Sequence, residues 1–211
     1  MLALIQAIPR VNTETVGKWT GQGAFRYISY PIDSLKEFGR RRILREYRHL
    51  DHGFGPLYDG QSRILILGSF PSVASRAVQF YYGHPQNRFW RVVSTILNEP
   101  LPGTVEEKRA LALRHGIALW DSIESCDIVG SSDSSIKNAV PADIPRILRE
   151  APVERIFCNG ALSGRVYTKY LLPVTGLPCR VLPSTSPANA ACSLEKLVKV
   201  WGEALINYTE K

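Results

Sequence analysis

The stretch that decides the fold is Ile64-Leu-Ile-Leu67, followed directly by Gly68-Ser-Phe-Pro-Ser72. A short apolar run that ends in Gly and Pro is typical of a buried strand that stops in a tight loop. Open α/β sheets bind their ligands at this end of a strand. Farther along stands Tyr81-Tyr-Gly-His-Pro-Gln-Asn-Arg-Phe-Trp90, whose aromatic rings can stack on a planar ring while its His and Asn bond the ring's edge. Together the two stretches predict a pocket for a planar ring beside a glycine loop.

The composition is typical of one globular domain. The chain has 211 residues, of which 45% are hydrophobic, enough for one sizeable core but too few for two comfortable domains. The net charge of +7 favours a polyanionic partner. Most of this excess lies in residues 1–50, which contain nine Lys and Arg and four Asp and Glu. The region that carries the motifs has only a small positive balance.

The cysteines and the apolar segments argue against several classes of protein. No two of the four cysteines form a CxxC pair, so neither a zinc site nor an iron–sulfur cluster is indicated. We expect free thiols and a reducing cytoplasm. No run approaches the ~20 apolar residues of a membrane helix. The apolar N-terminus lacks the basic region and the cleavage site of a signal peptide. A cytoplasmic protein without membrane contact is therefore expected.

Residues 1–50 differ from the rest, and we interpret them as a basic extension of a single domain over residues 51–211. Residues 1–31 show no sustained period. Asp33 and Ser34 predict the cap of a helix over residues 35–50, which carries five arginines. The favoured interpretation is a solvated, partly ordered extension. The alternative is an arm that contacts phosphates.

From His52 onward, strand-like runs alternate with helical patterns. Strands are predicted at residues 63–70, 117–123, 155–158 and 179–183. Helices are predicted at residues 89–97, 105–115, 141–150, 161–171 and 193–208, the last with Ser193 as its N-cap. Strands that alternate with helices form a mostly parallel sheet with helices on both faces.

Three motifs stand in order at predicted strand ends or helix starts. They are Gly68-Ser-Phe-Pro-Ser72, Tyr82-Gly-His-Pro-Gln-Asn-Arg-Phe-Trp90 and Leu182-Pro-Ser-Thr-Ser-Pro-Ala-Asn189. These motifs resemble the uracil-DNA glycosylase superfamily, and most closely its hypoxanthine-DNA (deoxyinosine) glycosylase branch. The stretch Ser122–Ile136 is similar to that branch as well. Any one motif would be weak, but three in order, in a resemblance that covers about residues 52–205, argue against chance.

The resemblance implies both a fold and a reaction. The fold is α/β, a three-layer α/β/α sandwich with a central four-stranded, mostly parallel sheet. The reaction is hydrolysis of the bond between a damaged base and deoxyribose, after the nucleotide has been flipped out of the DNA. The implied partner is double-stranded or single-stranded DNA that contains deaminated bases. No metal or organic cofactor is implied, and a monomer is the default expectation.

The resemblance places base-binding groups in the first two motifs. Tyr82 lies where the superfamily has the aromatic ring that stacks on the flipped base; the alternative is a core aromatic. The loop of Gly68, Ser69, Phe70 and Pro71 is expected to present backbone amides to the water, the base or a phosphate. Many superfamily members have Asn or Asp at the position of Phe70 to position the attacking water. This departure counts against ordinary uracil-glycosylase activity and points to another amide for the same work.

Asn87 and His84 are the candidate catalytic residues. The Asn87 amide has a donor and an acceptor, so it can hold a water or pair with a purine ring. The hypoxanthine branch resembles this chain in carrying an Asn after His-Pro. Asn87 is also placed to cap the helix that begins near Phe89, and the two roles are compatible. His84 either donates to the leaving base or belongs to a turn with Pro85.

The third motif is expected to contact the DNA backbone. The resemblance implies that Ser184, Thr185 and Ser186 donate hydrogen bonds to phosphate oxygens. Ala188 or Asn189 would lie nearest to the gap left by the flipped base. Some relatives have a His in this motif that stabilises the base anion, and this chain has none. The alternative is a turn that leads into a helix.

Four other charged residues are open to several interpretations. Asp121, Asp127 and Asp133 lie near predicted strand ends. Each can cap a helix, pair with an Arg, or position the water. Arg88 can contact phosphate or pair with an acid.

The residues and the resemblance together predict a monofunctional DNA glycosylase. It hydrolyses the N-glycosidic bond of deoxyinosine with water as the nucleophile, releases hypoxanthine and leaves an abasic site. Two alternatives remain open. One is the same reaction on uracil or xanthine, and the other is a lesion- or single-strand-DNA-binding protein that has lost the chemistry.

Overall fold

The computed structural model describes residues 13–20, 24–31, 47–130 and 132–209. The chain divides into two compact units, Met1–Glu46 and Tyr47–Lys211. In the first unit, β1 (Thr13–Thr20) pairs antiparallel with β2 (Ala24–Pro31). This hairpin was not predicted, because no sustained period marks its strands.

The helix predicted over residues 35–50 is wrong in the part that the structure describes. Arg48–Asp51 forms a strand, β3, which belongs to the second unit. The rest of the predicted helix, up to residue 46, lies outside the described residues. Strand β3 pairs antiparallel with a strand that begins far along the chain, and local sequence carries no signal of such a partner.

The centre of the second unit is a four-stranded parallel sheet in the order β5-β4-β8-β9. Its strands are β4 (Ile64–Gly68), β5 (Ile117–Asp121), β8 (Arg155–Asn159) and β9 (Cys179–Leu182). Every residue of β4 and β5 is buried, in accordance with their continuous apolar runs. All four predicted strands and the parallel sheet are confirmed.

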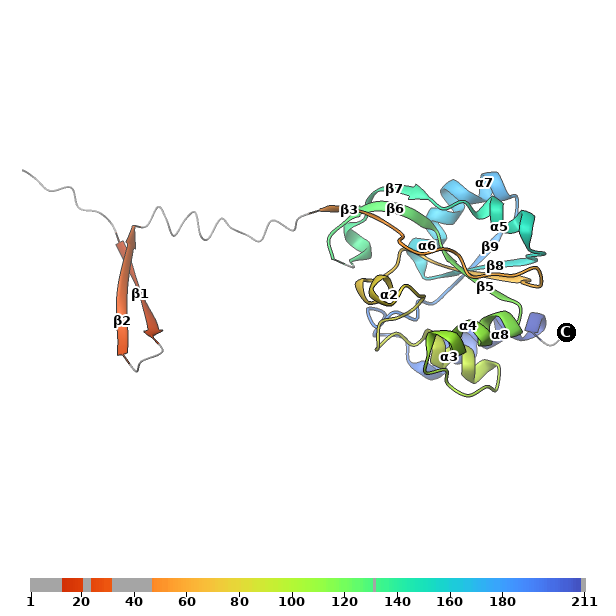
Figure 1. Cartoon of the computed structure of the whole chain (residues 1–211), viewed down its shortest axis with the longest axis horizontal. Helices are drawn as coiled ribbons and strands as arrows, with labels where there is room; N and C mark the ends of the chain where they lie inside the picture. The colour runs from red at the N-terminus through yellow and green to blue at the C-terminus, as the bar shows by residue number, and fades with distance from the viewer. Residues whose placement is uncertain (1–12, 21–23, 32–46, 131, 210–211) are drawn as a thin grey trace, which may run out of the picture. The chain divides into compact units, whose positions relative to one another are not determined.

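Helices cover both faces of this sheet and give the predicted three layers (Figure 1). One layer contains α3 (Phe89–Ile96), α4 (Val105–Arg114) and α8 (Leu194–Thr209). The other contains α5 (Ile144–Glu150), α6 (Ala161–Val166) and α7 (Leu172–Thr175), with the π-helical turn Tyr167–Leu171 between α6 and α7. Ser193 caps α8 as predicted, since its Oγ accepts from the Lys196 amide at 3.2 Å.

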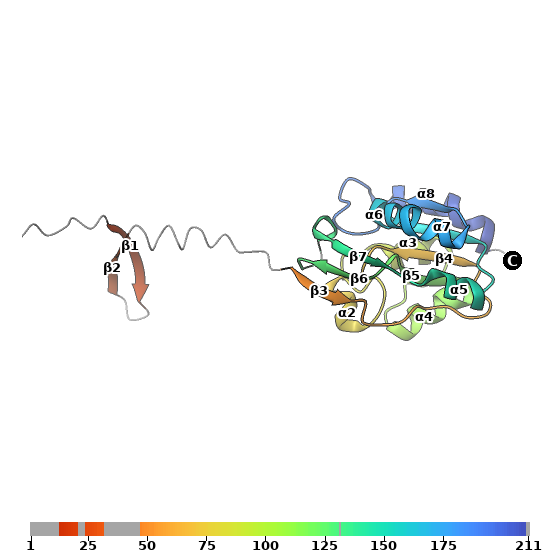
Figure 2. The ribbon, with the colours of Figure 1, turned by 90° about the horizontal axis from the view of Figure 1, so that it is seen from above.

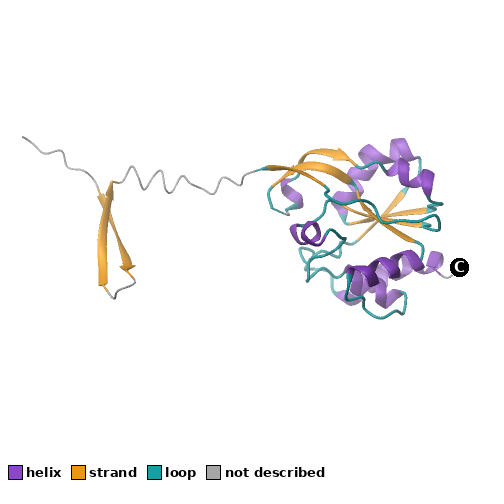
Figure 3. Ribbon diagram, viewed as in Figure 1, coloured by secondary structure: helices purple, strands orange, loops and turns teal. Residues whose placement is uncertain are grey.

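A second, antiparallel sheet was not predicted. It has the order β3-β6-β7, with β6 (Ile123–Ile128) and β7 (Lys137–Pro141), and Figures 2 and 3 show its strands beside the parallel sheet. A short 3₁₀ turn, Asp133–Ser135, lies between β6 and β7. The helix predicted from Pro141 therefore starts later, at Ile144. The Asp143 carboxylate caps it by accepting from the Arg146 amide at 3.1 Å.

One short helix, α2 (Val73–Val78), was also missed. It follows the glycine loop directly, and the Ser72 hydroxyl caps it by accepting from the Ser75 amide at 3.1 Å. All four cysteines are free thiols. Within the described ranges, no helix is long and apolar enough to cross a membrane, and no group of His, Cys, Asp and Glu has the arrangement of a metal site.

Candidate active site

A cavity opens at the carboxyl edge of the parallel sheet. Gly68 ends β4, Asp121 ends β5 and Asn159 ends β8, and the segment 183–188 follows β9. The cavity has a volume of about 390 Å³, within the range of small-molecule sites. It is lined by Phe54, Gly68, Ser69, Phe70, Pro71, Ser72, Ser75, Tyr81, Tyr82, Asn87, Asp121, Ile128, Ser132, Asp133, Ser134, Asn159, Ser184, Ser186 and Ala188.

Most of the site residues predicted from the sequence meet in this cavity. Those that line it are Gly68, Ser69, Phe70, Pro71, Tyr82, Asn87, Ser184, Ser186 and Ala188. Three predicted residues are not among the lining residues, and these are His84, Thr185 and Asn189. The three motifs therefore converge on one cavity, although some of their members support the wall instead of forming it.

The side-chain amide of Asn87 is held in one orientation by two donors. Its Oδ1 accepts from the Phe89 backbone amide at 3.0 Å and from the Thr185 hydroxyl at 3.0 Å. Both donors require an oxygen at this position, so Nδ2 is the end of the amide that remains for a ligand. Among the described residues, no partner for Nδ2 is present. Asn87 thus accepts from the first backbone amide of α3, although Arg88 and not Asn87 is the N-cap residue of that helix, and its Nδ2 is left for a ligand.

Thr185 holds the side-chain amide of Asn87 in place. It is fully buried, and its Oγ1 accepts from Asn159 Nδ2 at 2.9 Å while donating to Asn87. The Thr185 amide in turn donates to Asn159 Oδ1 at 2.9 Å. A buried hydroxyl with both roles in use cannot donate to a phosphate, so the structure gives Thr185 a different role from the one expected.

Arg88 holds the third motif against the start of α3. Its guanidinium donates to the backbone oxygens of Ser186 at 2.7 Å and of Asn189 at 3.0 Å, and also to that of Cys192. Its Nε donates to the Thr185 oxygen at 3.3 Å. Within the described part of the chain, Arg88 pairs with no acidic side chain, and its guanidinium donates to backbone oxygens instead of being left for a phosphate. Its hydrogen bonds hold the loop of the third motif close to Asn87, which precedes Arg88 in the chain.

His84 and Asn189 make local contacts. His84 Nδ1 accepts from the Gln86 amide at 3.2 Å, and the His84 oxygen accepts from the Asn87 amide at 2.8 Å. This is the turn that the sequence allowed as an alternative. Asn189 Nδ2 donates to the Ser184 oxygen at 2.9 Å and so shapes the loop from within.

Tyr82 lies in the cavity wall with an unusual backbone conformation. Its φ of +53° is in the left-handed region, which aromatic residues seldom adopt. One face of its ring stacks on Phe89 with centroids 3.7 Å apart, so only the opposite face is available to a ligand. The hydroxyl is buried and has no hydrogen-bond partner among the residues that the structure describes. Burial raises the pKa of this phenol far above its ordinary range, so it remains neutral.

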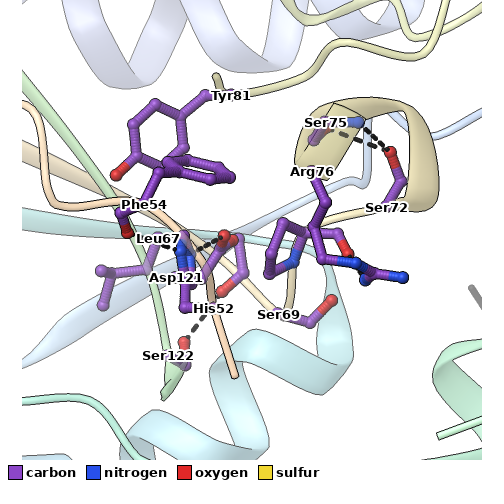
Figure 4. A network of polar contacts seen from close by, with 12 residues as sticks. His52, Phe54, Leu67, Ser69, Ser72, Ser75, Arg76, Tyr81, Asp121 and Ser122 are labelled. Atoms are coloured by element: carbon purple, nitrogen blue, oxygen red, sulfur yellow. Dashed lines mark hydrogen bonds and ion pairs between the residues drawn. The ribbon is translucent and has the colours of Figure 1, made fainter. Parts of the chain in front are cut away.

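A buried histidine–aspartate pair lies behind the glycine loop (Figure 4). His52 Nε2 and Asp121 Oδ2 are 2.7 Å apart, and His52 Nδ1 lies 2.9 Å from the Phe54 backbone oxygen. The His52 ring also stacks on Trp120, with centroids 4.0 Å apart. The exposed fractions of the two polar residues are 1% for His52 and 6% for Asp121. Asp121 lines the cavity, and His52 supports it from outside.

Sequence reasoning considered Asp121 but missed His52. The two residues are 69 positions apart, and their contact depends on β3 pairing with β6, which no local pattern indicates. The usable signal was an Asp at the end of a buried strand, because a carboxylate in that place needs a polar partner.

A second carboxylate belongs to an exposed part of the wall. Asp133 is an exposed residue of the short turn after β6, and Ser69 Oγ donates to its Oδ1 at 3.1 Å. Asp121 and Asp133 are the only charged residues that line the cavity within the described ranges. The cavity therefore favours a species that develops positive charge.

Comparison with known proteins assigns the chain to a family. The sequence model of the uracil DNA glycosylase superfamily matches residues 55–205. The chain belongs to this superfamily, whose members are DNA glycosylases. It is 38% identical over 142 residues to a hypoxanthine DNA glycosylase of Methanosarcina acetivorans, a match that covers 66% of this chain and 89% of the relative. It is 35% identical over 154 residues to a hypoxanthine DNA glycosylase of Methanosarcina barkeri, covering 72% and 96%.

A solved structure agrees with this assignment. The NMR solution structure of a candidate uracil DNA glycosylase from Methanosarcina acetivorans superimposes with a TM-score of 0.65 at 34% identity. The match covers 75% of this chain and 98% of that protein. The predicted family and the predicted fold class are confirmed.

Proposed function

We propose that this DNA glycosylase removes hypoxanthine from deoxyinosine in DNA by hydrolysis and leaves an abasic site. The observation that carries the proposal is the Asn87 amide in the cavity wall, whose oxygen is occupied by two donors and whose Nδ2 has no partner among the described residues. Two relatives at 38% and 35% identity are named hypoxanthine DNA glycosylases, which supports the choice of base.

The geometry supports a division of the charge that develops in the reaction. As the bond between C1′ and N9 breaks, its electron pair moves to the base and positive charge develops on the sugar. Asn87 Nδ2 donates to a heteroatom of the departing base and stabilises its negative charge. The Asp133 carboxylate, on an exposed part of the wall, favours the positive sugar. A water adds to C1′ and loses its proton, and the base gains one.

In this proposal the other lining residues hold the flipped nucleotide. The free face of the Tyr82 ring stacks on the base, with Phe89 bracing the ring from behind. Gly68, Ser69, Phe70 and Pro71 border the same space. Ser184, Ser186 and Ala188 line the cavity from the third motif, where they can contact the DNA around the extruded nucleotide. Thr185 makes no direct contact with the DNA in this proposal, since its buried hydroxyl is committed to internal hydrogen bonds. Only Nδ1 of His84 is used internally, by the Gln86 amide.

The test is single-turnover release of base from labelled duplexes that carry one deoxyinosine, deoxyuridine or deoxyxanthosine. We expect release of hypoxanthine, and we expect Asn87→Ala to slow it by about 10²–10³-fold, the usual cost of one preorganised donor. The matched control is Gln86→Ala, which removes an exposed neighbouring amide and should leave the rate unchanged.

Each other outcome identifies a different error. Release of uracil alone would place the protein in the same family with another substrate. Tight binding of the deoxyinosine duplex without any release would indicate a lesion-binding protein. Strand breaks that form without hot alkali would contradict the monofunctional mechanism.

A further inference from the structure

We propose that Arg76 binds a phosphate of the DNA backbone beside the extruded nucleotide. Arg76 belongs to α2, the short helix that follows the glycine loop directly. The inference rests on the DNA substrate of the superfamily and does not depend on which base is removed. It adds to the proposed function a contact that holds the DNA at the border of the cavity.

The Arg76 side chain lies against the loop that lines the cavity. Its Nη1 donates to the Pro71 backbone oxygen at 2.5 Å, and its guanidinium carbon lies 5.7 Å from the centre of the Phe70 ring. Phe70 and Pro71 both line the cavity, and so does Ser75, the residue before Arg76 in the chain. Figure 4 shows the side chain extending from α2 toward this loop. The guanidinium is therefore held at the border of the cavity.

The guanidinium is a half-buried positive charge without a negative partner. In the described ranges no carboxylate forms an ion pair with Arg76, and its Nε and Nη2 have no hydrogen-bond partner. Partial burial lowers the pKa of this group, because surroundings of low polarity disfavour its charged form. An anion that binds here compensates for that burial. A phosphate suits the guanidinium, since the planar fork of Arg matches two phosphate oxygens.

The charge of the cavity explains why the DNA needs such a contact. The charged residues that line it, in the part of the chain that the structure describes, are the acidic Asp121 and Asp133. Carboxylates in this place repel the phosphates of an approaching DNA. Arg88, which adjoins Asn87, does not offset them, because backbone oxygens of the third motif take up its donors. Arg76, in contrast, keeps Nε and Nη2 for an anion.

The location of Arg76 indicates which part of the DNA it meets. When a nucleotide is flipped, its base enters the cavity while the phosphates on either side remain outside. Arg76 does not line the cavity itself but lies next to residues that do. A group in this position contacts the backbone and does not read the base. The contribution of Arg76 to binding should therefore be the same for a duplex with deoxyinosine and for one whose extruded nucleotide has no base.

The experiment measures equilibrium binding of the full chain to a duplex with a tetrahydrofuran abasic-site analogue, which has no base to release, over a range of salt concentrations. Each contact with a phosphate contributes about 0.9 to the slope of log K against log salt concentration. We expect Arg76→Gln to weaken binding about tenfold at low salt and to reduce the magnitude of this slope by about 0.9. Arg76→Met should have the same effect while keeping an apolar side chain over Phe70.

The matched control is Arg149→Gln, which removes the same charge from the opposite edge of the sheet. Arg149 is an exposed residue in the last turn of α5, and the chain runs from there to the amino end of β8. The cavity opens at the carboxyl edge, so we expect Arg149→Gln to leave the salt slope unchanged. Arg76→Lys retains the positive charge, and its slope should stay close to that of the wild type.

A purely structural role for Arg76 predicts a different result. If the side chain only braces the loop through Pro71, its replacement would lower the Tm and slow the release of base, but the salt slope would remain that of the wild type. An unchanged slope in folded Arg76→Gln and Arg76→Met would therefore overturn the inference.

A second measurement locates the phosphate. Single phosphates on either side of the abasic analogue are replaced in turn with an uncharged methylphosphonate. In the wild type, replacement at one of these positions should weaken binding about tenfold, and in Arg76→Gln the same replacement should have no further effect. No loss at any position in the wild type, or losses that all persist in Arg76→Gln, would contradict the proposed contact. Neither measurement requires release of a base, so a failure to release hypoxanthine would overturn the proposed function and leave this inference standing.

Discussion

Replacing Thr185 with Val tests whether the buried hydrogen bonds from Asn159 to Thr185 and from Thr185 to Asn87 matter for activity. Val has nearly the shape of Thr but no hydroxyl, so the change removes the bond to Asn87 Oδ1 and the bond from Asn159 Nδ2. Each hydrogen bond contributes about 0.5–1.5 kcal/mol. The expected loss of stability is therefore about 2 kcal/mol, or a Tm lower by about 4–8 °C for a unit of this size.

The effect on activity should exceed the effect on the fold at the assay temperature. Without Thr185 the Asn87 oxygen keeps only the Phe89 amide, and the side-chain amide gains freedom to rotate. Small losses of alignment in a catalytic group cost up to about 10²-fold. We expect release of hypoxanthine to slow by about 10–100-fold at a temperature where the variant is fully folded.

Thr185→Ser is the matched control, because it retains the hydroxyl and removes only a methyl group. Its Tm should fall by a few degrees at most, and its rate should remain within about threefold of the wild type. Release and thermal unfolding are measured on the same preparations. A Thr185→Val variant that is folded and releases base as fast as Thr185→Ser would show that the Thr185 hydrogen bond does not hold Asn87 in its active orientation.

Three other predictions concern single positions. Gly68→Ala should displace the Asp121 carboxylate, since the new Cβ would lie 2.1 Å from Oδ1; we expect a lower Tm and at least tenfold slower release, and a wild-type rate would contradict the packing. Tyr82→Phe removes a buried hydroxyl that has no described partner, and an unpaired buried polar group costs about 1–3 kcal/mol. The Tm of this variant should therefore stay the same or rise, and a clear fall would show that the hydroxyl has a partner. Cys179 is half-buried and accepts a hydrogen bond from Cys158, which lowers the pKa of its thiol to about 7. Alkylation followed by mass spectrometry should therefore label Cys179 before the three buried cysteines, at a rate that rises as pH passes through about 7, and Cys158→Ala should move that rise to higher pH.

The sequence was sufficient for the parallel sheet because its strands are signalled locally. The run from Ile64 to Leu67 is apolar throughout and ends at a glycine, and the other three strands have similar boundaries. The antiparallel sheet lacked such a signal. Strand β7 is largely exposed and contains polar residues, and β3 finds its partner in β6 across a long stretch of chain. A pattern that depends on distant pairing is invisible in a local window.

The same distinction explains the site. Asn87 and Tyr82 stand in motifs that a sequence displays, and both line the cavity. His52, in contrast, becomes significant only when folding brings it to Asp121. Thr185 was placed in the correct loop but given the wrong environment, because sequence does not indicate which hydroxyl of Ser184-Thr-Ser186 faces inward.

The clamp made by Arg88 has a consequence for any attempt to change the substrate range. Four backbone oxygens between positions 185 and 192 converge on this one side chain, which adjoins Asn87 in the chain. Loop and helix start are thus a single module. If the loop over residues 185–192 alone were exchanged with that of a relative, its backbone oxygens would no longer match the Arg88 guanidinium. The side-chain amide of Asn87 would then shift. A graft that preserves activity must transfer residues 87–88 together with the loop.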